Sequence, residues 1–142
     1  MPDQHPKVAI LGCCGIGQTV STVIRRAVYA VRDARPESVV LIGSGPLTGD
    51  VPEVLEAASR HPLVVIDGCS PRCATKLAEG KQLEVAATIY AGRILTQNRL
   101  SLLGEKREEL GERGLAASRA IADSILETVD RLLQEQSNPA AG

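Results

Sequence analysis

Aromatic residues are almost missing from this chain of 142 residues, which has two tyrosines, no phenylalanine and no tryptophan. Proteins that bind single-stranded nucleic acid usually stack its bases on aromatic side chains, and this chain offers no such platform. An excess of one charge is missing too, because 16 basic and 17 acidic residues leave a net charge of −1. A polyanion would need a basic surface. The sequence therefore predicts no nucleic-acid partner.

Long hydrophobic runs are also missing. No stretch approaches the roughly 18 apolar residues of a membrane helix, and the apolar segment after the polar residues 1–7 is too short for a signal sequence. We therefore expect no membrane partner and a cytoplasmic location. In that reducing compartment, clustered cysteines are more often metal ligands or redox groups than disulfides. The two histidines, His5 and His61, are expected to be solvent-exposed rather than ligands.

Short apolar runs alternate with helical patterns, which is typical of strand–helix–strand units around a parallel sheet. The core must be aliphatic, because 44% of the residues are hydrophobic and almost none is aromatic. The runs predict strands over Lys7–Gly12, Ser38–Gly43, Leu63–Asp67 and Glu84–Tyr90. The spacing of apolar residues predicts helices over 17–35, 52–59, 71–79 and 115–136, the third of them capped by Ser70.

These elements predict an α/β fold with three layers. We expect a Rossmann-like or flavodoxin-like parallel sheet of about four strands in the order 2-1-3-4, with helices on both faces and an extra C-terminal helix. One domain should span 7–135, with residues 137–142 as a disordered tail. The apolar stripe of the C-terminal helix belongs either to the core or to a homodimer interface.

The chain has four cysteines, and each pair of them follows a predicted strand. Cys13 and Cys14 end the first apolar run, and Cys69 and Cys73 follow the third. If these strands are neighbours, the thiols meet in a crevice at the carboxyl ends of the strands, where such sheets bind ligands. The segment 43–46, after the second strand, would form one wall of that crevice.

Four thiols are the number that a closed tetrahedral zinc site requires. Cys69 and Cys73 share one face of a first helical turn, whereas adjacent residues such as Cys13 and Cys14 bind one ion only if the backbone bends sharply. The site could instead use three thiolates and a fourth donor: water, the carboxylate of Asp67 or the hydroxyl of Ser44. Asp67 has a second interpretation, as the cap of the turn that follows it.

The residues that carry a family resemblance are Asp67-Gly68-Cys69, Cys73 three residues further on, and an earlier strand that ends in Cys-x-Gly-x-Gly-Gln. Over about residues 7–95 the chain resembles the DGC-domain family, in which four cysteines are proposed to chelate zinc. The resemblance implies zinc ligands at Cys69, Cys73 and Cys14 or Cys13. Members usually carry a further cysteine after the second strand, where this chain has residues 41–46. The second cysteine of the Cys13–Cys14 pair would replace it.

The glycine loop supports an alternative. Residues 12–17 follow a strand and open a helix, so their N–H groups could hold an anion or a small-molecule ligand. The segment from Cys14 resembles the phosphocysteine loop of IIB components of the bacterial sugar phosphotransferase system, with Cys14 as nucleophile and Thr19 and Ser21 as supporting hydroxyls. The arginine of the related phosphatase loops is missing. The alternative is therefore a thiol-based enzyme or carrier acting by phosphoryl, redox or sulfur transfer, and it leaves Cys69 and Cys73 unexplained.

Overall fold

The structure is a computed structural model, and it describes residues 5–13, 15, 18–68 and 71–137. Four strands form one parallel sheet: β1 (Val8–Gly12), β2 (Val39–Leu41), β3 (Leu63–Asp67) and β4 (Val85–Tyr90). Their order is β2-β1-β3-β4, which confirms the predicted fold class and strand order. The chain leaves β1 toward β2 on one side, and β3 returns on the other side of β1.

The register places the ends of β1 and β3 next to each other. Gly12 is opposite Ile66, and Ala9 is opposite Leu63. Both strands are buried on both faces, as expected for continuous Val, Ile and Leu runs in a parallel sheet. The sequence segments that follow the two strands therefore begin at the same edge of the sheet.

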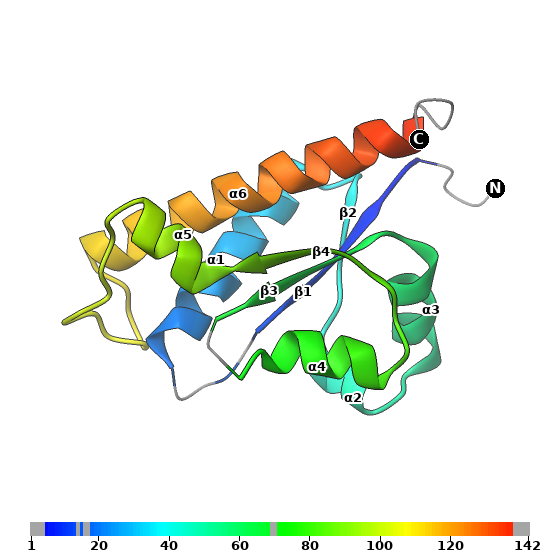
Figure 1. Ribbon diagram of the computed structural model, residues 1–142, viewed down its shortest axis with the longest axis horizontal. Helices are drawn as coiled ribbons and strands as arrows, with labels where there is room; N and C mark the ends of the chain where they lie inside the picture. Colours follow the sequence, from blue (N-terminus) through cyan, green and yellow to red (C-terminus); the bar gives the residue numbers. More distant parts are fainter. Residues whose placement is uncertain (1–4, 14, 16–17, 69–70, 138–142) are drawn as a thin grey trace.

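Six helices of the described chain cover the sheet (Figure 1). The helices α1 (Thr19–Ala34), α5 (Ala91–Gln97) and α6 (Glu112–Ser137) lie on one face, while α2 (Ser44–Thr48), α3 (Pro52–Arg60) and α4 (Cys73–Gly80) lie on the other. Alternate residues of β1, β2 and β3 supply the two aliphatic cores: Ile10 faces α1 and α6, and Leu11 faces the smaller helices.

The C-terminal helix belongs to the core. The apolar stripe of α6 is buried against α1 and the sheet, with Ile121, Ile125 and Val129 fully enclosed. A bidentate ion pair between Arg35 and Asp130 joins the two helices at the surface, with both N–O distances at 3.0 Å. The helix begins at Glu112 and runs through Ser137, so it extends beyond both predicted ends.

Two short helices were missing from the predicted pattern. Helix α5 starts directly at the end of β4 and contains Gly92, which disfavours a helix. The Thr96 hydroxyl and the Asn98 amide donate to carbonyls four residues earlier, and side chains that can bond to the backbone in this way favour turns and helix ends over helix interiors. Helix α2 is only five residues long and carries a proline in its first turn. Neither helix is long enough to show the periodicity on which a sequence-based prediction depends.

The described helices include none long and apolar enough to cross a lipid bilayer.

Candidate functional site

Cys13 is fixed directly to β3. Its backbone N–H donates to the carbonyl of Ile66 at 2.9 Å and so extends the pairing of β1 with β3 by one residue. The thiol is half-buried and free. Its position therefore depends on the sheet, even though the residue lies just beyond the strand.

Cys73 is fixed to the same strand by another route. It is the first residue of α4, and the next residue, Ala74, donates its backbone N–H to Oδ1 of Asp67 at 3.0 Å. Thr75 donates its N–H to the same oxygen at 3.3 Å and its hydroxyl to Oδ2. Cys13 is thus hydrogen-bonded to Ile66, and the residue after Cys73 is hydrogen-bonded to Asp67. Ile66 and Asp67 are the last two residues of β3. The Cys73 thiol is free and exposed.

Asp67 is a helix cap. It is fully buried, and both of its carboxylate oxygens accept hydrogen bonds from the first turn of α4. A carboxylate is favoured there because unpaired N–H groups and the helix dipole give the N-terminus a partial positive charge. The capping interpretation is therefore confirmed, and both oxygens of Asp67 are already engaged by the first turn of α4.

The start of α4 differs from the prediction. The helix begins at Cys73 rather than at residue 71, and Arg72 occupies the N-cap position in a left-handed conformation, with φ of 55°. Arg72 makes no side-chain capping bond, and Asp67 supplies that function from the strand. The predicted cap, Ser70, lies outside the described residues.

A buried hydroxyl faces the loop that follows β1. Ser21, in the first turn of α1, is 1% exposed, and its Oγ lies 3.8 Å from Sγ of Cys13. A Cβ atom placed on Gly15 would lie 3.5 Å from the same oxygen. The Ser21 hydroxyl is therefore close to both neighbours of Cys14. A hydroxyl in this position can donate a hydrogen bond to a thiolate.

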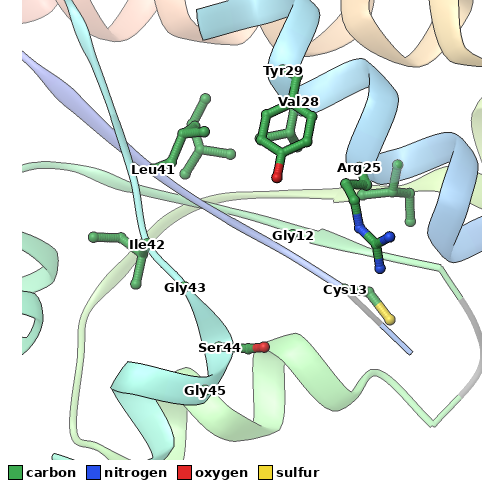
Figure 2. Close-up of a pocket in the computed structure, with 12 residues that line it drawn as sticks. Gly12, Cys13, Arg25, Val28, Tyr29, Leu41, Ile42, Gly43, Ser44 and Gly45 are labelled. Carbon is green, nitrogen blue, oxygen red and sulfur yellow. The ribbon is translucent and has the colours of Figure 1, made fainter. Parts of the chain in front are cut away.

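A cavity of about 330 Å³ opens beside Cys13, between β1, β2 and α1. Its inner wall is aliphatic, from residues such as Ile10, Val28 and Leu41. Figure 2 shows the Arg25 guanidinium directed toward Cys13 and the hydroxyls of Tyr29 and Ser44 turned into the same space. Small-molecule sites commonly combine an apolar lining with a few polar groups in this way.

The cavity lies one strand away from the predicted crevice. The prediction placed it between the ends of β1 and β3, where α1 packs closely on the residue after β3: a Cβ atom on Gly68 would lie 3.0 Å from Val20 and from Ile24. The described cavity is lined by Cys13 and not by Cys73. The expected wall at 43–46 is confirmed for Gly43, Ser44 and Gly45.

Arg25 is the residue that sequence reasoning missed. The helical pattern of α1 places Arg25 and Arg26 on the exposed face, and both are exposed. Arg25 nevertheless reaches over the cavity beside Cys13. This side chain reaches the site only because α1 crosses over the end of β1. The spacing of residues in the sequence does not predict that crossing.

Two of the four predicted metal ligands, Cys14 and Cys69, lie outside the described residues. Within the described part, no three His, Cys, Asp or Glu residues form a group that could hold a metal ion. His61 is half-buried rather than exposed, and it lies before β3, at the sheet edge opposite the cysteines. Burial lowers its pKa, and the nearby charges of Arg60 and Lys7 lower it further.

Comparison with known proteins identifies the family. No curated protein and no solved structure is significantly similar to the chain. The family model of the DGC domain matches residues 9–113, a span that includes all of β1 except Val8, the Asp67-Gly68-Cys69 segment and all four cysteines. This chain belongs to the DGC domain family.

Proposed function

We propose that the protein binds zinc through thiolates drawn from Cys13, Cys14, Cys69 and Cys73. The observation that carries the proposal is the attachment of Cys13 and Cys73 to the end of one strand. Cys13 bonds to Ile66, and Asp67 holds the first turn of the helix that Cys73 begins. Cys14 follows Cys13 directly in the sequence, and Cys69 lies two residues after Asp67, so the proposal draws all four thiols from segments that start at these two anchored positions.

The donor set suits zinc. Thiolates are preferred ligands of this ion, and four of them form a closed tetrahedral site. Cys13 and Cys73 are free thiols accessible to a ligand, and the Ser21 hydroxyl can donate to a metal-bound thiolate of Cys13. Such a second contact orients a ligand and tunes its affinity for the metal. With Asp67 used as a helix cap, the fourth donor would be a thiolate, water or Ser44.

The test is the zinc content of protein purified without added metal. We expect zinc in near-stoichiometric amount in the wild type and a large loss in Cys73→Ser and in Cys69→Ser. The matched control is His61→Asn, which removes a common zinc-binding side chain from the opposite sheet edge and should leave the zinc content unchanged. Metal-free wild-type protein, with four thiols that all react rapidly with a thiol probe, would refute the proposal.

A second candidate is a thiol-based carrier or enzyme with Cys14 as nucleophile. It is favoured by the Ser21 hydroxyl beside the loop and by Arg25 over the adjoining cavity, since these groups could hold an anionic group on a nearby sulfur. This function requires one reactive thiolate. It predicts that Cys14→Ser alone abolishes labelling by a thiol reagent at neutral pH, whereas Cys73→Ser has no effect on it.

A further inference from the structure

A second, more polar cavity lies on the other side of the cysteine edge. Its volume is about 580 Å³, and it is bounded by β4, α5, α6 and the residue before α4. Two isoleucines, Ile89 and Ile94, contribute its apolar surface. The remaining lining residues all carry polar side chains: Arg72, Thr88, Tyr90, Arg93, Ser124 and Thr128.

The described lining of the cavity has two positively charged side chains and no negatively charged one. Arg72 and Arg93 both line it, they come from different elements, and both are exposed. Neither guanidinium forms a hydrogen bond or ion pair with any described residue, and none of the described lining residues is acidic. By contrast, Arg35 and Arg60 on the same molecule are paired with carboxylates.

Arg72 is held in an unusual backbone conformation. Four non-glycine residues of the described chain have positive φ, and three of them, Asp50, Gln82 and Arg99, follow the ends of helices. A left-handed residue is common at that position. Arg72 instead precedes a helix, where an extended conformation is usual. A long cationic side chain therefore stands at a position whose left-handed backbone favours glycine.

The hydroxyl groups of the cavity complement the arginines. The Thr128 hydroxyl donates to the carbonyl of Ser124 at 3.0 Å, so its hydrogen is already used. The hydroxyls of Thr88, Tyr90 and Ser124 form no hydrogen bond with any described residue and are free to donate. Two guanidinium groups and three hydroxyls therefore line one space.

We infer that this cavity binds the phosphate group of a small phosphorylated molecule. The available donors exceed what the two oxygens of a carboxylate accept, and they suit the three terminal oxygens of a phosphate ester. The cavity is larger than one phosphate group, so it also holds part of the ester, against Ile89 and Ile94. The inference does not depend on zinc, because none of its residues is a proposed metal ligand.

The experiment is an NMR titration of the full chain with inorganic phosphate at constant pH and ionic strength, with acetate as the carboxylate arm. We expect saturable shifts at residues of β4, α5 and α6 with phosphate and weaker ones with acetate. Arg93→Gln and Arg72→Gly should each weaken phosphate binding about ten-fold or more, since each loses a charge-assisted hydrogen bond. Glycine at position 72 suits the left-handed backbone and so preserves the fold.

The matched control is Arg119→Gln, which removes one exposed arginine of α6 that has no partner among the described residues and does not line the cavity. It should leave the phosphate affinity nearly unchanged. Equal weakening in Arg119→Gln and Arg93→Gln would overturn the inference, because the effect would then be one of general surface charge. Binding lost in Cys73→Ser but kept in Arg93→Gln would overturn it too, by assigning phosphate to the cysteine edge. Absence of zinc would leave the expected shifts unchanged.

Discussion

The carboxylate of Asp67, at the end of β3, holds Thr75 of α4 through two hydrogen bonds. Oδ1 accepts the Thr75 N–H at 3.3 Å, and Oδ2 accepts the Thr75 hydroxyl. With the bond from Ala74, this contact fixes the first turn of α4 against the sheet. Cys73 is the first residue of that turn, so the geometry of the proposed zinc site depends on a carboxylate that is not itself a ligand.

Replacing this carboxylate should therefore affect both stability and zinc content. In Asp67→Asn the side-chain amide keeps one acceptor oxygen. Its NH2 group, however, faces donors of α4, and two donors cannot form a hydrogen bond. We expect a loss of about 1–3 kcal/mol in the free energy of unfolding, measured with urea, and weaker zinc retention against a chelator. Asp123→Asn, an exposed change on α6, is the control and should alter neither quantity. An unchanged stability in Asp67→Asn would show that the cap contributes little.

Gly68 lies in close contact with α1. A Cβ atom there would lie 3.0 Å from Val20 Cγ1 and from Ile24 Cδ1, so these two side chains would have to shift by a few tenths of an ångström. Gly68→Ala should destabilise the protein by about 1–3 kcal/mol, as overpacking of a core does.

Gly80 is the matched control for that substitution. It ends α4, and a Cβ atom there meets nothing within 4 Å. Gly80→Ala should therefore stabilise the protein by about 0.5–1 kcal/mol, because alanine loses less backbone entropy in a helix. Thermal unfolding of the two variants should give shifts of opposite sign. Shifts of the same sign would contradict the packing of α1 on Gly68.

His61 should make stability depend on pH. Burial and the charges of Arg60 and Lys7 lower its pKa in the folded state, so the folded protein binds this proton less readily than the unfolded chain. The contribution to stability is fully present above the unfolded pKa of about 6.5 and is lost as the pH falls through the lower folded pKa. His61→Gln should lose less stability than the wild type between pH about 7.5 and 5 in urea titrations. Parallel pH profiles would contradict this account of His61.

Helix α6 should behave as part of the core. Ile125 lies on α6 and is fully buried against α1 and the sheet, so Ile125→Ala should lower the free energy of unfolding by about 2–5 kcal/mol. The control is Glu127→Ala, at an exposed position of the same helix, which should change the free energy of unfolding little. If Ile125→Ala instead altered the oligomeric state with no loss of stability, the stripe would serve an interface between chains.

The sheet could be predicted because its signals are local. Four aliphatic runs separated by helical segments leave few alternatives to a parallel sheet, and β2-β1-β3-β4 is a common strand order of doubly wound sheets. The same order brings the segments after β1 and β3 to one edge. The position of Cys13 and Cys73 at that edge was therefore predictable from spacing alone.

The details of the site were not predictable, because they depend on how helices pack. Asp67 can be a ligand or a cap in sequence, and only the position of α4 decides between them. Arg25 looks like any exposed helical arginine until α1 is placed over the end of β1. The cavity beside Cys13 lies between β1 and β2, while Val20 and Ile24 of α1 pack close to Gly68 after β3. Each of these facts involves residues from two or three elements.

X-ray absorption at the zinc edge, on the wild-type protein as purified, tests the central proposal most directly. The account predicts bound zinc with a shell of three or four sulfur atoms at about 2.3 Å, and loss of one sulfur or of the metal itself in Cys73→Ser. Zinc surrounded by nitrogen and oxygen alone, or protein that contains no zinc, would contradict it.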